Sequence, residues 1–224
     1  RLDGLWVKGL YAFNNQKSSE SPANGNSSGV SLGSDIEMNS GNILGITYSN
    51  VSTDSKYGKD RDGDKLVSKN HMISIYVIHH FNDNLSLNSI FSASMGDINS
   101  KRVIDDSLAA NGKSRSKGFV SEATVNYKIK SGNNLLIIPN LGLRYSNFSE
   151  GSYNETGSGV HNMEVGAKSS YALTGTAGID IAIPNKLSES LTIIPSLQAS
   201  ISSDILSKSQ KVNSKLIWMD NYFE

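Results

Sequence analysis

The sequence contains no cysteine. This absence excludes three kinds of chemistry at once: a disulfide framework, a thiolate metal site and a cysteine nucleophile. Any stability or activity that the chain has must come from other residue types.

Long apolar runs are also missing. No stretch approaches the roughly eighteen consecutive apolar residues that mark a transmembrane helix, and the mean hydropathy is −0.32. A helical membrane protein is therefore excluded. A membrane β-barrel is not, because each of its lipid-facing residues alternates with a polar residue that faces the lumen.

The sequence also lacks an excess of positive or negative charge. Lys+Arg and Asp+Glu number 21 each, so the composition gives no sign of a nucleic-acid partner. The length of 224 residues suits one β-barrel domain over 1–224. Because Arg1 is preceded by neither a methionine nor a signal peptide, we expect the chain to be cut from a longer precursor.

The most regular pattern that is present runs from Phe119 to Tyr145. Two arms flank a turn at 131–134, and each arm alternates apolar with polar residues, which predicts an antiparallel hairpin. Each arm has roughly the ten residues that a tilted strand needs to cross a membrane, whereas soluble strands average about five or six. Aromatic residues stand at the far end of both arms, as they do at membrane interfaces. The hairpin therefore predicts an outer-membrane β-barrel.

Similar alternation predicts seven further strands, which gives nine in all. Long polar loops and short turns are predicted to alternate between them, and an outer-membrane barrel has such short periplasmic turns and long external loops. An even strand number is expected of a closed barrel, so we expect the remaining strands beyond Glu224. The seven strands are 4–14, 30–38, 44–48, 71–81, 85–96, 162–183 and 191–202; the loops are 15–29, 52–69, 97–118, 146–160 and 203–224; the other turns are 39–42, 82–84 and 184–190.

Candidates for catalysis or metal binding are sparse. Asp60, Asp62 and Asp64 flank a glycine, but the spacing and the closing Glu of a calcium loop are missing, which favours a solvated turn. His79 and His80 are adjacent on a predicted strand and so point to opposite faces. We therefore predict no metal, no cofactor and no enzymatic activity. The predicted loop 97–118 is basic in its second half, through Lys113, Arg115 and Lys117.

Several segments resemble one family, the translocator domains of autotransporters, which are bacterial type V secretion proteins. The resemblance rests on 4–9, on 29–35 followed by 42–48, and on 74–76, while 62–65 and 162–183 resemble rickettsial surface-antigen autotransporters in particular. It implies a twelve-stranded barrel in the bacterial outer membrane, a helix within the lumen and a passenger domain before the barrel. This chain lacks the lumen helix, the last three strands and the terminal aromatic residue of that pattern, so the domain is expected to be C-terminally incomplete.

The implied function is to anchor a passenger, an adhesin or surface antigen, and to help export it. The implied partners are outer-membrane lipid, the passenger with its linker helix, and the barrel-assembly machinery. Two hypotheses apply to the charged residues predicted to face the lumen: they grip the linker, or they only pair with one another across strands. These residues are Lys8, Asp35, Glu37, Glu122, Lys128, Arg144 and Asp180.

Three other interpretations remain open. The first is a small outer-membrane porin or adhesin whose own loops bind host or solute. The second is an outer-membrane hydrolase, for which no His and Ser or Asp constellation can be assembled. The third is a soluble β-sandwich, in which the apolar faces would pack against a second sheet and stay dry.

Overall fold

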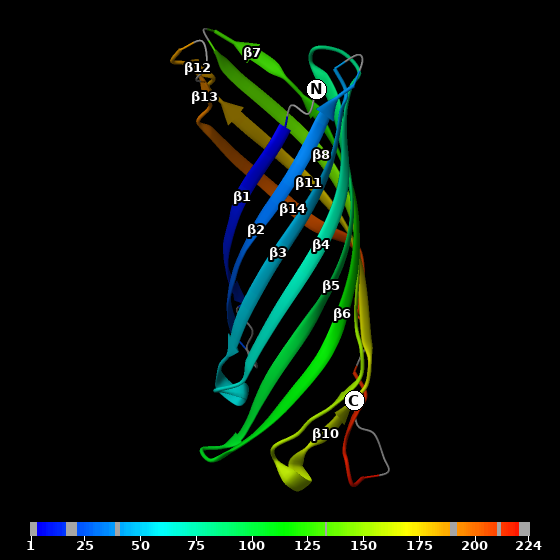
Figure 1. Cartoon of the computed structure of the whole chain (residues 1–224). Coiled ribbons are helices and arrows are strands. Elements are labelled where there is room, and N and C mark those ends of the chain that lie inside the picture. The colour runs from blue at the N-terminus through cyan, green and yellow to red at the C-terminus, as the bar shows by residue number, and fades with distance from the viewer. Residues whose placement is uncertain are drawn as a thin grey trace.

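The computed structural model describes residues 4–16, 22–38, 41–132, 134–188, 192–209 and 212–219. Its main feature is one antiparallel sheet whose nine principal strands follow one another in chain order, with β7 (Ile129–Ser131) added beside β8. Figure 1 shows these strands tilted and curled together. They are β1 (Gly4–Gln16), β2 (Ala23–Glu37), β3 (Ile43–Tyr57), β4 (Lys65–His80), β5 (Leu85–Asp105), β6 (Leu108–Tyr127), β8 (Leu135–Glu150), β11 (Lys168–Ala182) and β14 (Ser196–Ser209).

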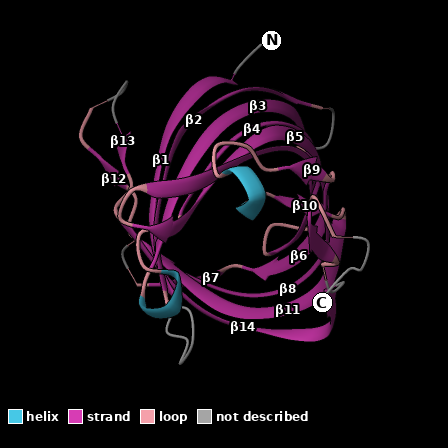
Figure 2. Ribbon diagram, turned by 90° about the horizontal axis from the view of Figure 1, so that it is seen from below, coloured by secondary structure: helices cyan, strands magenta, loops and turns pink. Residues whose placement is uncertain are grey.

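The sheet curls around its polar face. Seen along its length, the strands follow one another around an arc from β1 to β14 (Figure 2). Side chains converge on the inside of such an arc and diverge on the outside, so the inner face is the less exposed one. Ser74 on the inner face is 1% exposed, whereas Leu141 and Ile201 on the outer face are 68% and 78% exposed.

This distribution of polarity is the reverse of that in a soluble protein. Among the described residues, only Ile98 and Ala110 are buried apolar residues. No second sheet of comparable size is stacked on the apolar face in the described part of the chain. The outward apolar band therefore requires an apolar solvent, which rules out the β-sandwich and confirms the predicted transmembrane barrel architecture.

The height of the apolar band matches a bilayer. On β6 it runs from Tyr127 to Phe119, about 27 Å along the strand, or about 21 Å after correction for a tilt near 40°. Tyr48 lies in the same cross-strand row as Phe119, and its hydroxyl is 2.6 Å from Nδ1 of His71, which lies in the next row. On β3 and β4, a polar contact therefore begins where the apolar residues end. Within the described residues, no helix has the length and apolarity needed to span a membrane.

The strands extend well beyond the predicted ones. The predicted loop 97–118 is wrong, because Asp97 pairs with Arg115 and Lys101 with Asn111 up to the turn at Asp106 and Ser107. Much of the predicted loops 15–29 and 52–69 is likewise strand, since β2 begins at Ala23 and β3 ends at Tyr57. The apolar alternation stops at the membrane boundary, whereas the backbone hydrogen bonds between strands continue beyond it. The apolar pattern therefore shows how far the membrane-spanning part of a strand extends, and not where the strand ends.

The predicted single strand 162–183 is also wrong. It divides into β10 (Met163–Val165) and β11, and β10 belongs to a separate small sheet with β9 (Tyr153–Asn154) and β15 (Ser214–Leu216). Strand therefore replaces parts of the predicted loops 146–160 and 203–224. The predicted turn 184–190 contains β12 (Asn185–Lys186), which pairs with β13 (Thr192–Ile193), and the predicted start at Leu191 lies outside the described residues.

The two ends of the sheet differ as predicted. At one end the turns are short: Asn82 Oδ1 accepts the backbone N–H groups of Asn84 and Leu85, at 2.9 and 2.8 Å. The predicted turn 39–42 is closed by Met38, whose N–H donates to the Asn42 carbonyl at 2.7 Å, although Asn39 and Ser40 lie outside the described residues.

At the other end, the hairpins carry the small sheet and the 3-10 helices η1 (Lys59–Arg61) and η2 (Gly159–His161). Arg102 holds this layer by donating to both carboxylate oxygens of Glu155, at 3.0 and 2.5 Å, and to the His161 carbonyl at 2.8 Å. The hydrogen bonds to Glu155 raise the pKa of Arg102. This bidentate pair, in which Glu155 is buried, fixes the long external segment to β5.

The face assignment predicts the effect of a charge in the band. Leu141→Arg places a guanidinium on the convex face near mid-bilayer and should lower the free energy of unfolding by about 2 to 4 kcal/mol. Urea titration of the protein in lipid vesicles measures this loss. Thr176→Arg is the matched control. Thr176 pairs with Gly142, the residue after Leu141, so it lies at a similar depth, but its side chain faces the concave side. Equal losses in both variants would show that the faces are misassigned.

Candidate functional site

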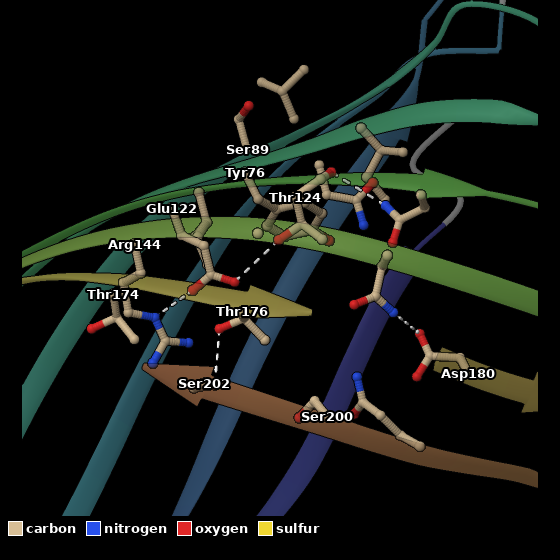
Figure 3. A pocket seen from close by; sticks show the side chains of 18 residues that line it. Tyr76, Ser89, Glu122, Thr124, Arg144, Thr174, Thr176, Asp180, Ser200 and Ser202 are labelled. Atoms are coloured by element: carbon tan, nitrogen blue, oxygen red, sulfur yellow. Dashed lines mark hydrogen bonds and ion pairs between the residues drawn. The ribbon is translucent and has the colours of Figure 1, made fainter. Parts of the chain in front are cut away.

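The concave face contains a polar cavity of about 580 Å³. Strands β4, β5, β6, β8, β11 and β14 all contribute to its lining. On the last four of these strands the lining residues are alternate ones, because every second residue of a strand points inward. Figure 3 shows these side chains and labels several of them, among them Tyr76, Glu122, Arg144 and Asp180. The cavity therefore brings together three of the seven charged residues that were predicted to face the lumen.

The central ion pair of the cavity joins β6 to β8. Glu122 lies directly opposite Arg144 in the register, and Arg144 Nε is 2.6 Å from Glu122 Oε2. The Arg144 side chain is 56% exposed and that of Glu122 is 28% exposed. The pair is therefore partly solvated, so its net contribution to stability is small. The guanidinium stays open to further hydrogen bonding from the cavity.

A second polar pair joins β8 to β11. Asn140 is buried, and its amide Nδ2 donates to Asp180 Oδ2 at 3.1 Å. Farther along the same face, the Thr174 hydroxyl donates to Asp204 Oδ1 at 2.7 Å, and Thr176 Oγ1 lies 2.9 Å from Ser202 Oγ. The lining is thus a set of short cross-strand pairs that still present oxygen and nitrogen atoms to the cavity.

A hydrogen-bonded chain of three side chains lies beside the cavity on β1, β2 and β4. Trp6 Nε1 donates to the Tyr76 hydroxyl at 3.2 Å, and that hydroxyl donates to Asp35 Oδ2 at 2.6 Å. Trp6 stands opposite Gly33, and Tyr76 stands opposite Gly45. A Cβ atom at either glycine would collide with the ring lying over it. The glycines therefore make room for two aromatic rings that lie flat across neighbouring strands.

The remaining predicted residues lie elsewhere. Lys8 is exposed on β1 opposite Ser31, and Glu37 is exposed at the end of β2. Lys128 sits between β6 and β7, where its backbone exchanges hydrogen bonds with Asn84 at the short-turn end. None of these three lines the cavity. Trp6 and Tyr76 were not predicted as site residues; an aromatic residue on a polar face opposite glycine is the signal that could have found them.

The described residues form no group of three His, Asp or Glu side chains that could hold a metal ion. Asp64 has a structural contact instead, because its Oδ1 accepts the Val103 N–H at 2.8 Å while Arg61 Nε lies 3.0 Å from Oδ2. His79 packs edge-on against the ring of Phe81. The arrangement can bind polar groups, but it shows no assembled catalytic constellation among the described residues.

A curled antiparallel sheet with an apolar outside and a polar, cavity-bearing inside defines an outer-membrane β-barrel protein. The family can be stated more closely. A family model described as the autotransporter β-domain matches residues 5–221, so the chain belongs to the autotransporter β-domain family. That family is one of secretion domains and not of enzymes, and its place is the bacterial outer membrane.

The relatives in sequence are rickettsial surface proteins. The chain is 31% identical over 229 residues to the putative surface cell antigen sca1 of Rickettsia conorii, a match that covers 99% of this chain and 12% of that protein. It is 27% identical over 224 residues to outer membrane protein A of the same species, with 95% and 11% covered. The chain therefore spans only about an eighth of the relatives it matches.

Solved structures agree on the fold. The translocator domain of the autotransporter NalP from Neisseria meningitidis matches with a TM-score of 0.80 at 14% identity, over 98% of this chain and 80% of that one. The β-domain of the Bordetella autotransporter BrkA matches with a TM-score of 0.66 at 13% identity, over 96% and 86%. The predicted family and fold are therefore confirmed.

The stacking of Tyr76 over Gly45 can be tested by filling the space that the glycine leaves. Gly45→Val should lower the free energy of unfolding by about 1 to 3 kcal/mol, because the new side chain overlaps the ring. Adding Tyr76→Ala should recover part of this loss. Gly9→Val is the control, since nothing lies within 4 Å of a Cβ added there. A loss at Gly9 as large as that at Gly45 would contradict the steric explanation.

Proposed function

We propose that this chain is the part of an autotransporter that anchors the protein in the outer membrane and carries its passenger to the cell surface. The observation that supports this most is the inversion of polarity across one curled sheet. The convex apolar side chains suit lipid, and the concave polar side chains suit a hydrated passage. The surface-antigen names of the relatives favour a passenger that is displayed and contacts the host, as an adhesin does.

Within this proposal, the cavity lined by Glu122, Arg144 and Asp180 holds the linker between passenger and barrel. Three features support this role. The lining comes from six strands, the Arg144 guanidinium is more than half exposed, and carboxylate, amide and hydroxyl groups all face the same space. A linker helix crossing the cavity would find donors and acceptors for its polar side chains at every turn.

Two further partners belong to the same proposal. Outer-membrane lipid covers the convex band, because side chains such as Leu141 and Ile201 cannot remain in water without aggregation. The barrel-assembly machinery supplies the route by which such a band reaches the membrane.

The absence of cysteine gives a direct test. Thr176→Cys places a thiol on the cavity wall, and Ala177→Cys places one on the convex face one residue away. In the full-length protein, with a second cysteine scanned along the linker, we expect disulfides to form with the position 176 variant and not with the position 177 variant. Non-reducing gels of outer-membrane fractions report the cross-link.

Surface display is measured on the same cells by the accessibility of the passenger to protease added outside. Cross-links at both positions, or at neither, would contradict the linker assignment. A passenger that stays protected from protease in cells whose barrel is folded would contradict the export role.

A further inference from the structure

A group of basic residues on β6 lies on the convex face, just beyond the apolar band. Lys113, Arg115 and Lys117 alternate along β6 with Gly112, Ser114 and Ser116, which face inward and are buried. Lys69 on β4 lies in the same row as Arg115, two strands away through Asp97. We call Lys69, Lys113, Arg115 and Lys117 the basic strip. All four side chains are exposed.

The positive charge of the strip is largely uncompensated. Within the described part of the chain, the one ion pair made by the strip joins Arg115 Nε to Asp97 Oδ1 at 3.9 Å, and both side chains are more than three-quarters exposed. Another carboxylate on this face, that of Asp54, is engaged by Lys65 at 2.8 Å. Four cations and one loosely held anion therefore face outward together.

The height of the strip fits the headgroup layer of the outer leaflet. Lys117 is two residues beyond Phe119, where the apolar band ends, and Arg115 is two residues farther along the same strand. With about 3.4 Å of rise per residue and a tilt near 40°, these two residues stand about 5 and 10 Å above the end of the band on β6. The polar layer of a bilayer is about 5 to 7 Å thick on each side. Flexible Lys and Arg side chains can bend toward it, as they do at other interfaces.

We propose that the basic strip binds the phosphate groups of lipids in the outer leaflet, and so fixes the height and rotation of the barrel in the membrane. A lipid beside β6 would place its acyl chains against Phe119 and its phosphate beside Lys117 and Arg115. The guanidinium suits a phosphate because it donates two parallel hydrogen bonds. This site lies on the opposite face of the sheet from the cavity, and it is independent of the linker assignment.

The test uses the full-length protein in detergent and two probes: diphosphoryl lipid A, and the same lipid with its phosphates removed. Native mass spectrometry counts the lipid that stays bound. We expect the wild-type protein to retain the phosphorylated lipid only. We expect Arg115→Gln/Lys117→Gln to bind that lipid at least about tenfold more weakly, since each surface cation contributes to anionic-lipid binding. Arg115→Lys should retain most of the binding.

The matched control is Lys130→Gln/Lys186→Gln, which also removes two positive charges, but at the short-turn end of the sheet. This control should bind like the wild type. Heat-modifiable migration on gels shows that all variants are folded.

Three outcomes would overturn the proposal. Equal retention by the strip variant and the wild type would remove the strip from lipid binding. Equal retention of the dephosphorylated lipid would reduce the contact to acyl chains. If the strip variant binds lipid like the wild type but no longer binds heparin, a soluble polyanionic saccharide, the strip would be assigned to a ligand in solution instead.

Discussion

A strand that crosses hydrocarbon must satisfy its backbone hydrogen bonds with neighbouring strands, because no water is there to do so. Every feature of this sheet depends on that constraint. The long paired strands from β1 to β14 supply the hydrogen bonds, and the two-residue period of a strand then divides the side chains into an outer and an inner set. The outer set can be apolar without cost and the inner set can be polar, so the chain has almost no buried apolar core among its described residues.

The inner set also shows how the curl of the sheet is accommodated. Side chains crowd on the concave face, and the chain relieves this crowding with serine, threonine and glycine. Gly33 and Gly45 go further, since they allow Trp6 and Tyr76 to lie across the neighbouring strands. The hydrogen bonds from Trp6 to Tyr76 and from Tyr76 to Asp35 then link β4 to β1 and β2 across the intervening strand β3. Packing and hydrogen bonding thus act at the same positions.

The sequence predicts those parts of this structure that depend on one strand at a time. The Phe119 to Tyr145 hairpin is visible because its apolar alternation is uninterrupted across the membrane. Glu122, Arg144 and Asp180 are recognisable by parity alone. The outer ends of β5 and β6 are not predictable in this way, because Asp97 and Arg115 pair as strand residues without any apolar signal. Nor is the stacking of Tyr76 over Gly45, since it depends on the register between strands, which no single strand encodes.

The long hairpins beyond the membrane follow from the same backbone constraint acting in a different solvent. In water, an unpaired strand end costs little, so the pairing of β5 with β6 out to Val103 needs another cause. Interstrand contacts supply it: Glu155 is buried and accepts two hydrogen bonds from Arg102, and Asp64 accepts the Val103 N–H. Glu155 and Asp64 belong to two different external segments, and these bonds connect both segments to β5. The part of the sheet beyond the membrane is therefore stabilised by a few charged side chains that accept several hydrogen bonds each. The part within the membrane is stabilised by backbone pairing between strands and by contact with lipid. The exposed cations of β6 lie at the boundary between these two parts.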